Sequence, residues 1–367
     1  MAHTTGSLDN AQQSPAAGLI MREQDPLNLE SSQSALRAWI TPADQFYVRS
    51  HFAEPDLDRS AWRLTVEGAV NEPGDVSFSD LTAMAAESQV AVMECAGNGR
   101  VFLSPKAEGT QWQLGAVGNA EYTGVPLAAL LARVGVLPTA VDVIFEGADC
   151  GQIADAPASP GEIHFAHSIP VATARAGQVL LAYRMNGADL TRSHGFPVRV
   201  VVPGWYGMAS VKWLTRIVVA DTPFQGFFQS MQYSGWERTH GAPTLVPVTE
   251  LQVKSIIVDP ELGGVVPSGG TYIVRGQAWT GEGTVSLVEI SVDDGAHWAP
   301  ARLTSPELPR AWRSWEFDWR PTAGRQSLMA RATDSRGRVQ PMDRDTDRRS
   351  YEINHVIPTA VVVRDRA

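Results

Sequence analysis

The chain has 367 residues, 44% of them hydrophobic and 19% charged, so it can bury large cores and is expected to form two or more domains. Its 40 acidic and 30 basic side chains give a net charge of -10, which argues against a nucleic-acid-binding surface. Its two cysteines, Cys95 and Cys150, cannot build a disulfide framework and lack the CxxC spacing of a zinc site, a redox pair or attached c-type haem.

The chain begins with a polar segment that shows no sustained hydrophobic period. Residues 1–30 are rich in Gln, Ser and Ala, which predicts a flexible N-terminal arm. This segment has neither twin arginines nor an apolar signal core, and no apolar stretch reaches the roughly 20 residues of a membrane span. The sequence as given predicts a cytoplasmic protein without a membrane contact, or a periplasmic one if an export signal has been trimmed.

The next part, residues 31–243, predicts a mixed α+β domain with many loops. Apolar runs predict short strands, and weaker helical patterns lie between them. The expected strands are 62–68, 90–95, 141–146, 179–183 and 197–202, and the expected helices are 79–86 and 126–134.

The last part, residues 244–367, has a different pattern. Short alternating strands follow one another closely and are separated by Gly, Pro and Asp-Gly turns. They are expected at 254–258, 270–279, 285–292, 314–319 and 326–334. This pattern is typical of an immunoglobulin-like β-sandwich.

The segment ECAGNGR places Cys95 at the end of an apolar strand, directly before a loop of small residues. Glycine lets the backbone approach a ligand, Asn98 offers hydrogen-bonding groups, and the Arg100 cation would favour a thiolate. A thiolate is either a nucleophile or a ligand for a soft metal. A nucleophile needs a histidine base, and His51, His164, His167 and His194 all leave a cysteine hydrolase open. An ordinary buried cysteine is the alternative, and it is the interpretation we give to Cys150.

Two further segments gather cations. The run SHGFPVRVVVPGWYGMASVKWLTRI places His194, Arg199 and Lys212 around a strand between Gly-containing loops, a layout suited to an anion such as a phosphate. In FYVRSH, Arg49 and His51 are two residues apart, so in a strand they would face the same side.

In the order FYVRSH, ECAGNGR, FEGAD, LLAYRMNG, HGFPVRVVVPG and SVKWL, these segments resemble the sulfite oxidase family of molybdenum enzymes over residues 46–221. The resemblance implies a mixed α/β molybdopterin-binding domain of the sulfite oxidase type, followed by an Ig-like dimerisation domain. In that family one pterin dithiolene and a single protein cysteine hold the metal, so Cys95 would be the molybdenum ligand. A soft thiolate suits this metal.

The resemblance also implies the other site residues. The residues that would bind molybdopterin and its phosphate are Tyr47, Arg49, Ser50, His51, Asp149, His194, Arg199, Ser210, Val211 and Lys212. Those that would meet the substrate are Arg49, Arg100, Trp112 and Tyr233. A departure from the animal members is Asn98-Gly99-Arg100, where those members place a second arginine. We find no counterpart for a further pocket arginine that some members contribute from the C-terminal half.

The implied activity is that of a bacterial, haem-free sulfite dehydrogenase-like member, which oxidises sulfite to sulfate as a homodimer. Residues 1–45 are too short for the b-type haem domain of animal members, so electrons would pass to a separate acceptor such as a cytochrome. Three alternatives stay open: reduction of a sulfoxide or nitrate on the same cofactor, a cysteine hydrolase active without metal, and a binding protein without cofactor.

Overall fold

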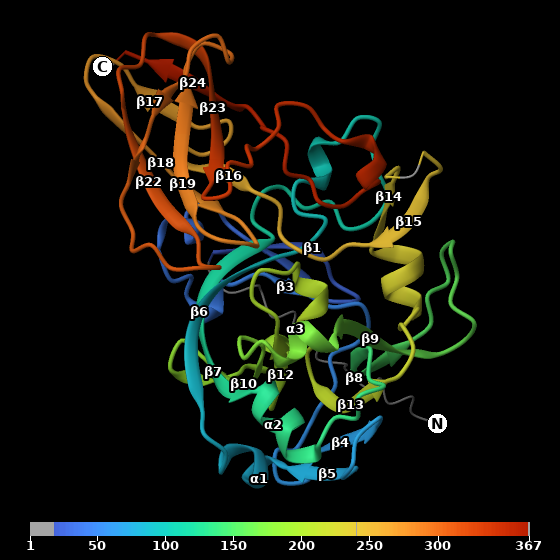
Figure 1. The fold of residues 1–367 in the computed structure, drawn as a ribbon. Helices are drawn as coiled ribbons and strands as arrows, with labels where there is room; N and C mark the ends of the chain where they lie inside the picture. Colours follow the sequence, from blue (N-terminus) through green and yellow to red (C-terminus); the bar gives the residue numbers. More distant parts are fainter. Residues whose placement is uncertain (1–17, 240, 366–367) are drawn as a thin grey trace, which may run out of the picture.

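The computed structural model describes residues 18–239 and 241–365, which form an N-terminal unit and a β-sandwich at its upper left in Figure 1. The N-terminal unit, residues 18–250, contains two five-stranded sheets. The first is antiparallel with the order β11-β10-β7-β6, and β12 also pairs with β10. Its strands are β6 (Glu87–Glu94), β7 (Val117–Pro126), β10 (Leu180–Met185), β11 (Ala188–Asp189) and β12 (Arg199–Val201).

The second sheet has the order β5-β4-β13-β8-β9, in which β13 and β4 run parallel and the other pairs are antiparallel. Its strands are β4 (Arg63–Gly68), β5 (Gly74–Ser77), β8 (Asp142–Gly151), β9 (Ile163–Pro170) and β13 (Leu214–Ala220). One continuous core of Val, Leu, Ile and aromatic side chains joins the two sheets. The loops that follow these strands carry the candidate site.

The helices of the described residues are few and short, so the predicted α+β layout is mostly β. They are α1 (Phe78–Thr82), α2 (Leu127–Val134) and α3 (Val171–Arg175). Helix α2 buries Leu127, Leu130, Leu131 and Val134 at a spacing that places all four on one face. None of the helices in the described ranges is long and apolar enough to cross a membrane.

The predicted flexible arm is wrong for residues 18–30, and residues 1–17 of it lie outside the described residues. Strands β1 (Leu19–Glu23) and β2 (Asn28–Ser31) form a hairpin that continues into β3 (Val48–Arg49). The hairpin is anchored by Glu30, which is 2% exposed and accepts hydrogen bonds from the backbone N–H groups of Gly115 (2.7 Å) and Gln113 (3.1 Å). A buried carboxylate with such partners gives no apolar pattern, so the sequence did not indicate the hairpin.

The sandwich consists of a four-stranded sheet, β16-β18-β22-β21, and a five-stranded sheet, β17-β24-β23-β19-β20. Its strands are β16 (Lys254–Asp259), β17 (Val265–Pro267), β18 (Tyr272–Trp279), β19 (Val285–Ser291), β20 (Ala299–Pro300), β21 (Arg302–Leu303), β22 (Arg313–Trp319), β23 (Gly324–Asp334) and β24 (Thr359–Arg364). Because side chains alternate along a strand, β16 turns Ile257 into the sandwich and Ile256 into the core of the N-terminal unit. The two units therefore share a packed interface.

Two features show that the chain does not divide into two separate units at the boundary expected from the sequence. The expected boundary between residues 243 and 244 falls in the turn of a hairpin formed by β14 (Ser234–Glu237) and β15 (Thr244–Pro247). In addition, residues 341–357 leave the sandwich and return over the N-terminal unit, where Glu352 donates its backbone N–H to the Ala96 carbonyl (2.8 Å). Figure 1 shows this red segment beside the teal loop around residue 100.

Candidate active site

Cys95 is the first residue after β6, and backbone hydrogen bonds fix its position. Its N–H donates to the Ala116 carbonyl and its carbonyl accepts from the Asn98 N–H, both at 2.9 Å. The following turn needs Gly99 at φ 101°. A Cβ on Gly97 would lie 2.3 Å from Nη2 of Arg100, so glycine leaves room for that guanidinium. Cys95 is therefore held 7% exposed at a strand end, as the sequence predicts.

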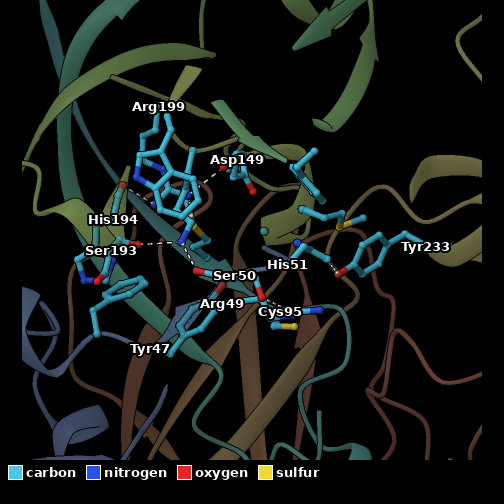
Figure 2. Close-up of a pocket in the computed structure, with 18 residues that line it drawn as sticks. Tyr47, Arg49, Ser50, His51, Cys95, Asp149, Ser193, His194, Arg199 and Tyr233 are labelled. Atoms are coloured by element: carbon cyan, nitrogen blue, oxygen red, sulfur yellow. Dashed lines mark hydrogen bonds between the residues drawn. The ribbon is translucent and has the colours of Figure 1, made fainter. Parts of the chain in front are cut away.

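Two cavities meet at Cys95. The first is lined largely by polar and cationic side chains, and Figure 2 shows Arg199 and Asp149 on one side of it and Cys95 and Arg49 on the other. The second lies between the N-terminal unit and the returning segment 341–357. The two cavities share Arg49, His51, Cys95 and Tyr233. A ligand in the second cavity could therefore contact a group bound in the first cavity beside the Cys95 side chain.

The first cavity, which we call the cofactor cavity, gathers cations that form no ion pair among the described residues. Lys212 donates to the Ser193 carbonyl (2.8 Å) and Ser50 Oγ (3.1 Å). Arg199 donates hydrogen bonds from its guanidinium group to the carbonyls of Ser210 (2.9 Å) and His194 (3.1 Å). In the part of the chain that the structure describes, neither cation, nor Arg49, forms an ion pair with a carboxylate. Their combined charge favours an anionic ligand.

Burial shifts the pKa values of two titratable groups of this cavity toward neutrality. Burial, together with the charge of Arg199, lowers the pKa of Lys212 to about 7, and burial raises the pKa of Asp149 to about 6. Asp149 also keeps Oδ1 buried without a hydrogen-bond partner among the described residues. An unsatisfied buried acceptor and unpaired cations fit a ligand that carries both a phosphate and N–H donors, as molybdopterin does.

The histidines near Cys95 are occupied by other partners. Nε2 of His51 lies 2.6 Å from the Tyr233 hydroxyl, and Nε2 of His194 lies 3.0 Å from the Ala43 carbonyl. Burial lowers the pKa of His194 to about 3 and that of His51 well below its usual value. His164 and His167 lie on β9 and line neither cavity. The described residues thus provide no histidine paired with the thiol, as a cysteine hydrolase would need.

The second cavity, which we call the substrate channel, contains both predicted substrate arginines. Arg100 is 6% exposed and donates Nη1 to the Thr110 carbonyl (2.9 Å), while its Nε and Nη2 reach the Ser350 carbonyl (3.3 Å each). Arg49 donates Nη1 to Asn28 Oδ1 (3.3 Å). Because both guanidinium groups are anchored, each presents a fixed charge to the channel.

Most predicted site residues line one of these cavities, and two do not. The cofactor cavity is lined by Tyr47, Arg49, Ser50, His51, Cys95, Asp149, His194, Arg199, Ser210 and Lys212, and the channel by Arg49, Arg100 and Tyr233. Val211 is 1% exposed and packs in the hydrophobic core. Trp112 is fully buried and meets Tyr47 edge-on, with ring centroids 6.5 Å apart.

The structure adds residues that sequence reasoning missed. Ser193 lines the cofactor cavity, and Glu23, Arg349 and Tyr351 line the channel. Tyr351 lies 5.0 Å from Tyr233 between ring centroids. Arg349 is an arginine from the C-terminal half that lines the channel, and it donates Nη1 to Ser234 Oγ (2.7 Å). The sequence offered no signal for Arg349 beyond the charge of this residue and its neighbours. The return of residues 341–357 to the N-terminal unit depends on distant contacts and produces no pattern in the local sequence.

Sulfate binding to the cofactor-free protein is expected to tighten about tenfold between about pH 8.5 and 5.5. As the pH falls through about 7, Lys212 gains a positive charge, and through about 6 Asp149 loses a negative one, so both changes favour the anion. Sulfate keeps its charge over this range. Isothermal titration calorimetry measures the effect, and the Lys212→Met variant should show a much flatter profile. Equal affinity at both pH values would contradict this assignment of charges.

Comparison with known proteins matches both units. Residues 51–228 match the model "Oxidoreductase molybdopterin binding domain", and residues 246–352 match "Mo-co oxidoreductase dimerisation domain". The sulfite oxidase of Gallus gallus is 35% identical over 88% of this chain and 73% of its own length. That of Arabidopsis thaliana is 31% identical over 92% of this chain and 91% of its own. The chain spans 61% of the length of mammalian sulfite oxidases that it also matches.

A solved structure extends the match to the whole fold. The sulfane dehydrogenase SoxCD from Paracoccus pantotrophus superposes with a TM-score of 0.81 and 28% identity, covering 97% of this chain and 92% of that one. The fold is therefore of the sulfite oxidase type. The motif order, the two matched domain models and relatives aligned over most of their length agree, and the chain belongs to the sulfite oxidase family of molybdopterin-dependent oxidoreductases.

Proposed function

We propose that this oxidoreductase oxidises sulfite to sulfate and passes the electrons to a separate acceptor. The observation that carries the proposal is the position of Cys95 where the cofactor cavity meets the arginine-lined channel. Relatives named sulfite oxidase in an animal and a plant support the choice of substrate. Sulfite is a small oxyanion, and a channel with several fixed guanidinium groups suits it.

The residues of the cofactor cavity would hold molybdopterin. Lys212, Arg199, His194, Ser50 and Ser210 would surround its phosphate, and Tyr47, His51 and Asp149 would contact the pterin. Cys95 would supply the one protein ligand to molybdenum, for which a soft thiolate is well suited. When bound, the cofactor supplies the transferred oxygen atom and accepts two electrons.

The residues of the channel would bind and orient the substrate. Arg49 and Arg100 would offset the charge of sulfite and of the departing sulfate, with Arg349 adding a third guanidinium. Burial raises the pKa of Tyr233, so its hydroxyl stays protonated. With the His51 Nε2–H donating to the hydroxyl oxygen (2.6 Å), Tyr233 would donate its own proton to a substrate oxygen. Trp112 lines neither cavity, so its role would be to hold the ring of Tyr47, against which it packs.

The same proposal covers the assembly. The C-terminal part matches a dimerisation domain, and we place the pairing surface of a homodimer on the sandwich, which we interpret as Ig-like. The electron acceptor would be a separate protein such as a cytochrome, with no haem bound by this chain.

Steady-state assays on molybdenum-loaded protein test the proposal. Sulfite should reduce an artificial electron acceptor in the presence of the protein, whereas sulfoxides and nitrate should be poor substrates with a reduced dye. Preferred reduction of a sulfoxide or nitrate would keep the family and overturn the proposed substrate. Turnover that persists in metal-free protein would overturn the reaction class.

Replacing Arg49 with methionine is expected to lower kcat/KM for sulfite by about 100-fold. Removing one charged partner from a desolvated contact costs about 2–5 kcal/mol, and 1.4 kcal/mol corresponds to a factor of ten. Arg49→Lys keeps the charge and loses the planar fork, so it should give an intermediate value. Arg325→Met, an exposed arginine on β23, is the matched control and should change kcat/KM less than twofold. An unchanged value for Arg49→Met would remove Arg49 from substrate binding.

A further inference from the structure

A carboxylate lines the same channel as the substrate arginines. Glu23, the last residue of β1, is half-buried there with Arg49, Arg100 and Cys95. It forms no ion pair with a cation in the described ranges. Its Oε2 instead accepts from two neutral donors, Asn28 Nδ2 and Thr110 Oγ1, the latter at 3.0 Å. A negative charge is thus fixed in a channel proposed to receive an anion.

The two donors that hold Glu23 are the same residues that anchor the arginines. Asn28 is fully buried, and its Oδ1 accepts from Arg49 Nη1 (3.3 Å) and from the Ser50 N–H (2.9 Å). Thr110 is 4% exposed, and its carbonyl accepts from Arg100 Nη1 (2.9 Å). Glu23 therefore connects the two guanidinium anchors through one intermediate residue on each side.

The charge of Glu23 also acts on Arg49 directly. Burial opposes the charge of this guanidinium, but Tyr233, Cys95 and Glu23 together raise the pKa of Arg49 above its usual value. The field that stabilises the Arg49 cation is the field that repels an incoming anion. In a cavity that is partly shielded from water, such an interaction between charges is screened less than at the surface.

We propose that Glu23 is a positioning residue of the channel and that its charge sets the channel's affinity for oxyanions. Its hydrogen bonds to Asn28 and Thr110 hold Arg49 and Arg100 at a fixed separation, and its charge limits how tightly the channel retains a doubly charged oxyanion such as sulfate. This inference rests on the proposed function. The charge weakens the binding of sulfite and sulfate alike, so that the product can leave.

Two variants separate the charge from the hydrogen bonds. Glu23→Gln keeps an oxygen that can accept from both Asn28 and Thr110 but loses the charge, whereas Glu23→Ala loses both. Sulfate binding is measured by calorimetry on molybdenum-loaded protein, and KM and kcat for sulfite are measured on the same samples. Glu72→Gln, an exposed carboxylate that lines neither cavity, is the control for net charge.

Glu23→Gln is expected to bind sulfate about tenfold more tightly and to lower the KM for sulfite by a similar factor, with kcat unchanged or reduced as product release slows. Glu23→Ala should lower kcat about tenfold without matching that gain in affinity, because both anchors are freed. The control should shift neither constant more than twofold.

Sulfate affinity within twofold of the wild type in Glu23→Gln would overturn the proposal. So would an equal loss of sulfate affinity in both variants, since that is the result expected if Glu23 only supports the fold. If the wild type failed to oxidise sulfite, the proposed function would fail, and the sulfate titration would still decide the role of the Glu23 charge.

Discussion

Replacing Cys95 with serine is expected to lower sulfite turnover by at least about 1000-fold while molybdopterin content stays within about twofold of the wild type. A serine hydroxyl is not deprotonated near neutral pH and is a harder donor than a thiolate, so it is a poor ligand for a soft metal. The cations around Lys212 and Arg199 are unchanged and would still hold the phosphate. Activity is followed by dye reduction, and pterin by fluorescence after oxidation.

The second cysteine supplies the matched control. Cys150 is half-buried on β8 and lines neither cavity, so Cys150→Ser should retain sulfite turnover within about twofold. If Cys95→Ser kept more than a tenth of wild-type turnover, Cys95 would not be an essential ligand.

Replacing Lys254 with methionine is expected to destabilise the protein by about 3–5 kcal/mol, because it leaves the buried Glu94 carboxylate without a counter-charge. Lys254 Nζ lies 2.7 Å from Glu94 Oε1, and both side chains are at most 2% exposed. Trp279 Nε1 donates to the other oxygen of Glu94 (2.8 Å), and Asn98 Nδ2 donates to Oε1 (3.0 Å). The pair thus ties the residue before Cys95 to the sandwich. Denaturant unfolding measures the loss.

The double variant Glu94→Gln with Lys254→Met removes both charges and keeps an amide that can bond to Trp279. It should recover most of the lost stability, since replacing a whole buried pair is far less costly than breaking one. A loss below about 1 kcal/mol in Lys254→Met alone would mean that water or a rearranged side chain reaches Glu94.

The local parts of the site could be predicted from the sequence. The strand before Cys95 is a continuous apolar run, and its loop contains the small residues that a tight turn needs, so both were expected. Strand β6 begins earlier than predicted, at Glu87, because pairing with β7 extends it beyond the apolar run. The cation-rich segments around Arg49 and Lys212 were also evident, because charge inside an apolar strand pattern is unusual.

The long-range parts could not be predicted in this way. Arg349 and Tyr351 reach the channel because residues 341–357 cross back from the sandwich, and such a return depends on contacts between distant residues. Glu23 belongs to a hairpin whose buried Glu30 and fully buried Asn28 look like surface residues in the sequence. The side chain of Val211 packs in the core, and its carbonyl accepts from the Val200 N–H (2.8 Å); no motif reveals either contact.

The central claim is that Cys95, which lines both the cofactor cavity and the channel, is the protein ligand of molybdenum. X-ray absorption at the molybdenum edge tests it. We expect about three sulfur neighbours per molybdenum in the wild type, two from the dithiolene and one from Cys95, and one fewer in Cys95→Ser at equal metal content. The Cys150→Ser spectrum should match the wild type. An unchanged sulfur count in Cys95→Ser would contradict the account.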